Sequence, residues 1–407
     1  MFRANQRPMQ LKNVNRISVL NYIRRNRFTT KAALASESGL TFMAIQKIME
    51  ELMALGLVRQ DALQGGYVGR KAVTYTIDEN YGYTIGLHIN MFKTRAAVMN
   101  LHGEIIAYHS IDMSSIQQDP TVLVEALVEA VNKVIEDSGV DRQKLLGVGV
   151  GAPGPINIQE GRILSPPNLT VLRYLPLKKI LEDRLGLSVL LHKDTNAIAM
   201  GEYWRGAGAD HSNMVYIDAD IGIGSGLILG GEMHEGANSI AGEFGHITLD
   251  IHGPLCNCGN HGCLEALGSG ISILKVLDQK LAERPEHPLR KNRRELSIQQ
   301  VLDAGNGGDP LAASVLNDAA YFMGMAVGNL INILDPEVII LGGILALEYV
   351  PYFEIVKGTV QQKALAVIRE NLIVPTVNAF RAGVIGAGEI VADNFFTTLV
   401  YEVLSKN

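Results

Sequence analysis

Residues 256–265 read CNCGNHGCLE, and this stretch contains all three cysteines of the 407-residue chain. His246 precedes Cys256 by ten residues, so a histidine stands close in sequence to a C-x-C-x4-C cluster. One imidazole and three thiolates form a closed tetrahedral ligand set for zinc, which leaves no open position for catalysis. Clustered cysteines also fit buried free thiols or a redox pair. We expect a structural zinc ion, bound by His246, Cys256, Cys258 and Cys263.

Two carboxylates flank these ligands, Glu243 in EFGH and Glu265 in CLE. A metal on one ring nitrogen of His246 fixes the tautomer and leaves the other N–H free to donate a hydrogen bond. Both glutamates can accept hydrogen bonds from ligand hydroxyl groups, although either one alone is more often a surface carboxylate. The metal is therefore expected to hold the floor of a polar pocket.

The composition is that of an ordinary globular protein, with 47% apolar and 19% charged residues. A length of 407 residues predicts two or three domains. We find no apolar run of about 18 residues, the length that spans a membrane. The N-terminus lacks the apolar core of a secretion signal. We therefore expect a soluble, cytoplasmic protein, in which clustered cysteines indicate a metal or a reactive thiol and not a disulfide framework.

Charge is distributed unevenly along the chain. Residues 1–80 contain 12 Lys and Arg against 6 Asp and Glu, whereas the whole chain has a net charge of −6. A basic N-terminal segment on an acidic body is typical of proteins that bind nucleic acid at one end. A charge run by itself is usually a solvated surface, so the pattern of residues within the segment decides its meaning.

The basic segment has the pattern of a helix-turn-helix. Apolar residues recur with helical spacing over residues 14–23. The first helix of the motif is expected to end at Gly39, where glycine can take a left-handed conformation. Thr41 can cap the second helix, which buries Ile45 and Leu52 and leaves its first turns exposed. In this motif the front of the second helix enters the major groove, where Gln, Lys and apolar side chains contact base edges and phosphates.

Residues 57–78 follow as two β-like runs around a glycine-rich tip, which is typical of a wing. Two cations at the tip, Arg70 and Lys71, are expected to meet the DNA backbone or the minor groove. A small helical interaction domain with a loose hairpin is the alternative, but motif, charge and wing together favour DNA binding. The predicted DNA-contacting residues are Thr41, Phe42, Met43, Gln46, Lys47, Arg70 and Lys71.

The remainder of the chain alternates strand-like and helical segments in two similar halves. Strand-like runs end in glycine-rich sequence at residues 145–154 in the first half, and at 213–231 and 337–345 in the second. Two α/β halves whose strand ends face a common cleft predict a duplicated, actin-like architecture. Periodicity alone supports only an α/β fold with two lobes.

An ordered series of motifs makes the prediction more specific: GAPGPI, SPPNLT, DTNAIAMGE, GIGSGLILGGEMHEGANSIAGEFGHI, GPLCNCGNHGCLEA and NLINILDPEVIILGG. Over residues 81–390 the chain resembles the ROK family of sugar kinases and sugar-responsive repressors. Its basic segment resembles the winged helix of the repressor branch. The expected fold is α/β, with an N-terminal winged helix-turn-helix (residues 1–80) followed by a two-lobed actin-like (ROK sugar kinase-like) body. The expected lobes are residues 81–200 and 201–407, with a C-terminal helix that returns to the first lobe.

The resemblance also implies roles for individual residues. In that family the cysteine cluster and its histidine hold a structural zinc ion, and residues around it bind a sugar. Asp194, in HKDTN, stands where family kinases place the general base for the attacking hydroxyl. The sugar-binding residues that the resemblance implies are Asn168, Asp194, Glu243, His246 and Glu265.

Three places depart from the pattern of family kinases. The first phosphate hairpin, normally similar to DIGGTK, reads HINMFK at residues 88–93, so Met91 replaces a glycine. Asp220 opens the second phosphate loop with a negative charge. Lys193 replaces an asparagine next to Asp194, where it is expected to pair with that carboxylate and reduce its basicity. Large side chains and negative charge obstruct phosphate groups, so we expect no ATP binding and no enzymatic activity.

These observations predict a sugar-responsive transcriptional regulator, a repressor whose binding to operator DNA is relieved by a monosaccharide in the cleft. We expect a homodimer or a higher homo-oligomer. Two alternatives stay open at this point: an active ATP-dependent sugar kinase with a DNA-binding head, and a repressor controlled by docking to a transport protein. The departure at Lys193 leaves xylose, glucose and N-acetylglucosamine all open as effectors.

Overall fold

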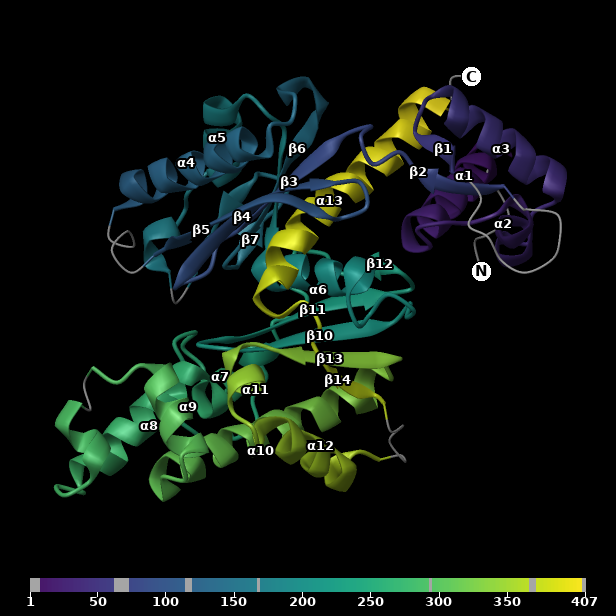
Figure 1. Cartoon of the computed structure of the whole chain (residues 1–407). Helices are drawn as coiled ribbons and strands as arrows, with labels where there is room; N and C mark the ends of the chain where they lie inside the picture. Colours follow the sequence, from purple (N-terminus) through teal and green to yellow (C-terminus); the bar gives the residue numbers. More distant parts are fainter. Residues whose placement is uncertain are drawn as a thin grey trace.

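The computed structural model of the chain describes residues 8–61, 73–113, 119–166, 169–292, 295–365 and 371–404. It consists of an N-terminal head and a body of two lobes, each built on a sheet with five described strands (Figure 1). The predicted fold class, a winged helix-turn-helix followed by a two-lobed actin-like body, is confirmed. The predicted domain boundaries at residues 80 and 200 stay predictions.

The first lobe is built from β3 (Tyr83–His88), β4 (Lys93–Asn100), β5 (Ile105–Asp112), α4 (Pro120–Ser138), β6 (Leu145–Ala152), β7 (Ile156–Asn157), β8 (Arg162–Ile163), α5 (Leu177–Leu185) and β9 (Val189–Lys193). The strand order of its main sheet is β5-β4-β3-β6-β9, an antiparallel meander followed by two parallel strands. α4 and α5 share an apolar cluster with one face of this sheet. The other face packs against α13 (Ala382–Thr398), near the end of the chain.

The second lobe repeats this topology with α6 (Asp194–Arg205), β10 (Met214–Ala219), β11 (Ile223–Leu229), β12 (Glu232–Met233), α7 (Leu264–Gly268), α8 (Gly270–Ala282), α9 (Ile298–Asn306), α10 (Pro310–Leu334), β13 (Val338–Gly342), α11 (Ile344–Glu348), α12 (Tyr352–Lys363) and β14 (Ile373–Pro375). Its strand order is β12-β11-β10-β13-β14, again a meander followed by two parallel strands. α6 packs on one face, and helices around α10 cover the other. The repetition is the duplication that the sequence predicted.

α10 is the central helix of the second lobe. By length and composition it would suit a membrane span, but 61% of its most apolar window is buried inside the protein. Its apolar side chains belong to one cluster with the sheet and with α8, α9 and α12. The hydrophobicity of α10 is therefore explained by its place in the core.

α6 and α13 cross between the lobes with their backbones in contact. A Cβ atom on Gly386 would clash with the carbonyl oxygen of Ala197, and a Cβ atom on Gly201 would clash with that of Ala382. Only glycine permits so close an approach. The two helices therefore form one stiff unit between the sheets, and α13 continues from it to the head (Figure 1).

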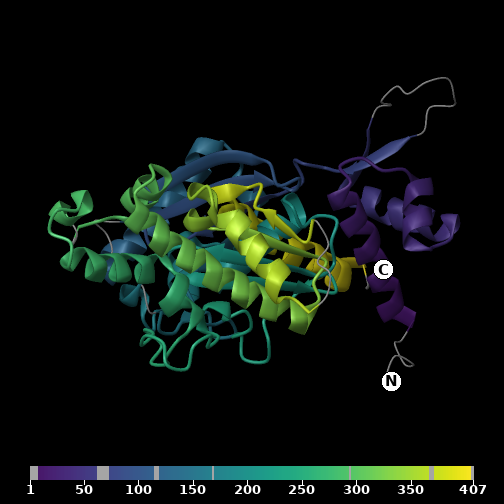
Figure 2. The same cartoon turned by 90° about the horizontal axis from the view of Figure 1, so that it is seen from below.

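The head contains α1 (Pro8–Arg25), α2 (Lys31–Ser38), α3 (Phe42–Ala54), β1 (Val58–Asp61) and β2 (Thr74–Ile77), with the two strands antiparallel. α2 ends at Gly39, whose φ of 67° is left-handed. The Thr41 hydroxyl accepts a hydrogen bond from the amide of Ala44 and so caps α3. Figure 2 shows the head projecting from one end of the body.

Candidate ligand pocket, metal centre and DNA-contacting surface

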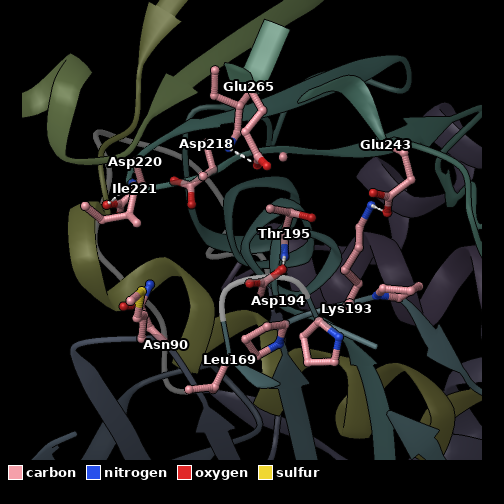
Figure 3. Close-up of a pocket in the computed structure, with 18 of the residues that line it drawn as sticks. Asn90, Leu169, Lys193, Asp194, Thr195, Asp218, Asp220, Ile221, Glu243 and Glu265 are labelled. Atoms are coloured by element: carbon pink, nitrogen blue, oxygen red, sulfur yellow. Dashed lines mark hydrogen bonds and ion pairs between the residues drawn. The ribbon is translucent and has the colours of Figure 1, made fainter. Parts of the chain in front are cut away.

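A pocket lies between the lobes at the N-terminal end of α6 (Figure 3). The turn between β3 and β4 lines it from the first lobe, and the β10–β11 hairpin lines it from the second. Asn168, one predicted sugar-binding residue, lies outside the described residues, but Pro166 and Leu169 on either side of it line the pocket. The other predicted residues are brought together here: Asp194, Glu243, His246 and Glu265.

Asp194 is the first residue of α6 and lies centrally in the pocket (Figure 3). Its Oδ1 accepts a hydrogen bond from the amide of Thr195 at 2.7 Å. Burial raises the pKa of Asp194 to about 6, and this outweighs the amide and the positive charge of Lys193, which both favour ionisation. A carboxylate with this pKa exchanges protons near neutral pH.

Lys193 is directed away from the partner that the sequence suggested. Its ammonium donates to the carbonyl oxygens of Ala241 and Gly242, at 3.1 and 3.2 Å, and to Oε1 of Glu243 at 3.2 Å. These three acceptors match the three donors of an ammonium group. The expected ion pair between Lys193 and Asp194 is therefore wrong, because the ammonium group pairs with Glu243. The charge of Lys193 still lowers the pKa of Asp194, as expected, but burial outweighs it and the net shift is upward.

Three more carboxylates reach the pocket from the second lobe. Asp220 and Glu265 each accept a hydrogen bond from a backbone amide, that of Ile221 at 2.7 Å and that of Ile223 at 3.1 Å. Burial raises the pKa of both carboxyls, and burial together with the nearby Asp220 and Asp194 raises that of Asp218. The sequence reasoning missed Asp218, although alternate carboxylates in YIDAD, at the end of a strand, pointed to the cleft.

Four side chains beside the pocket could hold a metal ion. Their ligand atoms all lie within 4.8 Å of one another, and they are the predicted set His246, Cys256, Cys258 and Cys263. The Nδ1 atom of His246 is 3.7 Å from the sulfur of Cys256. Its Nε2 atom lies 3.9 Å from a carboxylate oxygen of Glu243. The imidazole ring therefore stands between the cysteine cluster and the pocket.

Residues 256–263, which we term the cysteine loop, fold back tightly. The amide of Cys256 donates to the carbonyl oxygen of Asn260 at 2.7 Å. Gly262 has a φ of 62°, and a Cβ atom on it would clash with the carbonyl oxygen of Asp250. Glycine is thus required at this position, where the chain turns to bring Cys263 next to Cys258.

The β3–β4 turn presents a large apolar side chain to the second lobe. Met91 is half-buried and packs against the apolar cluster of the second lobe. His88 is buried, its ring nitrogens have no hydrogen-bond partner among the described residues, and burial lowers its pKa to about 3. It is therefore a neutral imidazole, packed closely against Gly383 of α13. The side chain of Met91 thus connects the two lobes at this turn.

Helix α3 and its cap expose most of the predicted DNA-contacting residues that the structure describes. Phe42 and Met43, next to each other in the first turn of the helix, are 52% and 74% exposed. Thr41 and Lys47 are also exposed, and Gln46 donates to Glu50 along the same helix at 3.0 Å. The two predicted wing residues, Arg70 and Lys71, lie outside the described part of the chain.

The model of the ROK family matches residues 84–394, which is most of the chain. The chain belongs to the ROK family. A xylose repressor of Caldicellulosiruptor bescii is 28% identical over 334 residues, which are 82% of this chain and 83% of the repressor. The crystal structure of a ROK family transcriptional regulator, a homologue of the E. coli MLC protein, has a TM-score of 0.79 at 25% identity. The match covers 98% of this chain and 100% of the regulator chain.

An enzyme of the ROK family is similar over a smaller part of the chain. The crystal structure of a ROK family glucokinase from Streptomyces griseus, in complex with glucose and AMPPNP, has a TM-score of 0.67 at 28% identity. It covers 76% of this chain and 99% of its own. The regulator and the glucokinase therefore differ in how much of this chain they match, and the regulator matches almost all of it.

Proposed function

We propose that the protein is a DNA-binding transcriptional regulator, a repressor whose operator affinity is lowered by a monosaccharide. The observation that carries this proposal is the match to a transcriptional regulator over 98% of the chain, head included. The exposed front of α3 supports a role in the major groove. A repressor that binds operator DNA acts in the cytoplasm, and a two-fold operator calls for a homodimer or a larger homo-oligomer.

The charges of the pocket favour an unphosphorylated sugar. Among its described lining residues are five carboxylates and one lysine, and the lysine is already paired with Glu243. Sugar hydroxyls donate hydrogen bonds to carboxylates, whereas a phosphate group would meet charge of its own sign. We therefore expect a neutral monosaccharide to bind through Asp194, Glu243, His246 and Glu265, together with Asn168.

The metal in this proposal is a structural zinc ion. One imidazole and three thiolates are the donor set of closed, tetrahedral zinc sites, and the four atoms are already gathered. Such a site supplies folding energy and no catalysis. His246 would bind through Nδ1, because that nitrogen faces Cys256, and would turn its Nε2–H toward Glu243 and the sugar.

Under this proposal the protein does not bind ATP, and the response to the sugar does not require it. Met91 fills the first hairpin and Asp220 brings negative charge to the second, so neither favours a phosphate group. One observation favours residual sugar kinase activity as a second candidate: Asp194 has the raised pKa of a general base. Sugar-dependent ADP production that Asp194→Ala abolishes would establish that candidate.

Fluorescence anisotropy tests the proposal. The full chain is titrated onto labelled DNA from upstream of its own operon, at one stated salt concentration, with and without each of D-xylose, D-glucose and N-acetyl-D-glucosamine. We expect specific binding that one sugar weakens, and a general loss of affinity in Lys47→Ala. Specific binding that no sugar weakens would contradict the sugar response and direct attention to docking by a transport protein.

A further inference from the structure

A buried ion-pair cluster joins the head to the body. The side chain of Arg24, in the last turn of α1, is 0% exposed and contacts two carboxylates of α13. Its guanidinium lies 2.9 Å from an oxygen of Glu389 and 3.1 Å from an oxygen of Asp393. Buried charges persist only where partners compensate them. The contact therefore fixes the end of α1 against α13.

The C-terminal end of α6 enters the same cluster. Arg205 donates from Nε to Glu389 at 2.6 Å and from Nη1 to the carbonyl oxygen of Arg24 at 3.2 Å. Burial raises the pKa of Glu389, but Arg205 and Arg24 outweigh burial and hold that pKa below its usual value. Glu389 therefore stays ionised and joins three elements, α1, α6 and α13.

Aromatic rings enclose the cluster. The Arg24 guanidinium lies 3.8 Å from the ring centroid of Trp204 and 4.6 Å from that of Phe396. The next residue, Arg25, lies 4.3 Å from the ring centroid of Tyr203. Phe396 also belongs to the apolar core of the head, so that core continues into α13. The head is thus docked on the body through packing and charge, beyond its covalent connection.

The opposite end of α6 lies in the pocket, at Asp194 (Figure 3). α6 has 12 residues, so at a rise of about 1.5 Å per residue its two ends are roughly 17 Å apart. Its backbone contact with α13 at Gly201 and Gly386 leaves it no room to bend. A shift of α6 at the pocket should therefore also displace Arg205, which contacts the head directly.

We propose that the cluster of Arg24, Glu389 and Arg205, which we term the junction lock, transmits sugar binding to the head. The inference rests on the proposed function and names the route by which that pocket is regulated. Sugar contacts at Asp194 shift α6, and Arg205 carries the shift to the carbonyl oxygen of Arg24 and to Glu389. The head then changes its orientation on the body, and operator affinity changes with it.

The single tryptophan of the chain gives this proposal a direct probe. Trp204 is the only tryptophan among 407 residues, and its ring lies against Arg24 in the lock. It does not line the sugar pocket. Because Trp204 belongs to α6, a sugar that binds at Asp194 should change Trp204 fluorescence only by shifting α6 against Arg24. Binding itself is measured separately by calorimetry, with D-xylose, D-glucose and N-acetyl-D-glucosamine as the probes.

Arg205→Lys tests the lock with its charge retained. The lysine ammonium lacks the planar fork with which Nε and Nη1 of Arg205 bond Glu389 and the carbonyl oxygen of Arg24 in one fixed geometry. Arg184→Lys is the matched control, because Arg184 makes a fork-like pair with Glu125 at 2.6 and 2.7 Å on the outer surface of the first lobe. Asp393→Asn is a milder second variant, which removes the negative charge of one half-exposed partner of Arg24 and keeps an acceptor oxygen.

The proposal expects three results together. The sugar that gives binding heat changes Trp204 emission in the wild type and in Arg184→Lys, and also in Arg205→Lys, because Trp204 lies on α6 itself. It weakens operator binding by roughly 5- to 150-fold in the first two proteins, the usual range of allosteric coupling, and by less than about twofold in Arg205→Lys. The sugar dissociation constant stays within about threefold in all three. Asp393→Asn gives an intermediate coupling.

Two results would overturn the proposal, and they are distinguishable. If a sugar binds and weakens operator affinity equally in the wild type, Arg205→Lys and Asp393→Asn, the lock is only a structural clamp and the proposed function stands. If no sugar of the panel gives binding heat, the proposed function fails and the lock fails with it. An Arg205→Lys protein that does not fold leaves the decision to Asp393→Asn, measured against Arg184→Lys.

Discussion

The two lobes share one sheet topology, yet their first hairpins present opposite chemistry to the cleft. The β3–β4 turn of the first lobe presents Met91, which packs onto the apolar cluster of the second. The β10–β11 hairpin of the second lobe presents the half-buried carboxylates of Asp218 and Asp220. Duplication thus preserves strand order, whereas function is set by a few residues at the hairpin tips.

The contrast between the hairpins bears on two parts of the cleft: the part where family kinases bind phosphate, and the part where the sugar is expected. The family resemblance assigns phosphate binding to these two hairpins, and the proposed function holds that neither binds a phosphate group here. The residues proposed to face the sugar, by contrast, are held by a backbone amide at Asp194 and by Lys193 at Glu243, and His246 belongs to the group that could hold a metal ion. Under the proposed function the pocket keeps its sugar contacts and lacks phosphate contacts, which would suit it to sensing a sugar without modifying it. The following predictions test the two parts separately.

Loss of the metal should have the largest effect. Cys263→Ser removes one ligand of a closed site, so we expect the cysteine loop to unfold and sugar binding to be lost, because His246, Glu243 and Glu265 lose their support. Elemental analysis and calorimetry measure the two losses. His261→Ala is the matched control, since His261 is an exposed histidine of the same loop outside the ligand set. Full sugar affinity in metal-free protein would contradict the account.

Asp194→Asn should stabilise the protein above pH 6. The pKa of Asp194 is raised from 3.8 to about 6 by burial, a shift that costs about 3 kcal/mol when the group is ionised in the folded state. The native state holds its proton more tightly than the unfolded chain, so this contribution is present at low pH and is lost as pH rises from about 4 to 6. Urea unfolding of both proteins at pH 4 and pH 7 measures the difference, which should grow with pH. Equal differences at both pH values would contradict the burial of this carboxyl.

Glu265→Gln should weaken sugar binding by about 1.5–3 kcal/mol, the usual contribution of a hydrogen bond to a charged group. The fold should be retained, because the glutamine carbonyl can still accept the hydrogen bond from the amide of Ile223. Calorimetric titration measures the loss. Glu235→Gln is the control, since Glu235 pairs with His192 and does not line this pocket. An unchanged dissociation constant would remove Glu265 from the sugar site.

Met91→Ala should have the smallest effect, a loss of about 1 kcal/mol of stability, because the side chain is only half-buried. It should leave sugar affinity unchanged and should not create ATP binding while Asp220 remains. Phe92→Ala, at an exposed neighbour in the same turn, should change stability by less than about 0.5 kcal/mol. Thermal unfolding compares the two. ATP binding by Met91→Ala alone would show that this side chain was the sole obstruction.

Local patterns in the sequence predicted the parts of the molecule that local physics decides. The cap at Thr41, the glycine at position 39 and the cysteine spacing each specify a turn or a ligand set within a few residues. Contacts between distant segments were not accessible in this way. Lys193 turns to Glu243 because residues 241–243 fold over it, and no spacing encodes that approach.

The junction between head and body shows the same limit. Arg24 and Glu389 are 365 residues apart in sequence, and each alone has the pattern of a surface charge on a helix. Their pairing depends on α13 returning between the lobes and reaching the head. The raised pKa of Asp218 likewise depends on three carboxylates meeting from two elements. Burial and charge proximity are tertiary properties, so these features required the structure.

One titration tests the central claim most directly. The protein is bound to its labelled operator, and the anisotropy is followed as D-xylose, D-glucose or N-acetyl-D-glucosamine is added, each with and without Mg²⁺ and ATP. We predict that one sugar releases the DNA and that nucleotide changes neither the midpoint nor the extent of release. Release that requires ATP, or ADP formed during the titration, would contradict the claim that this cleft senses a sugar without phosphorylating it.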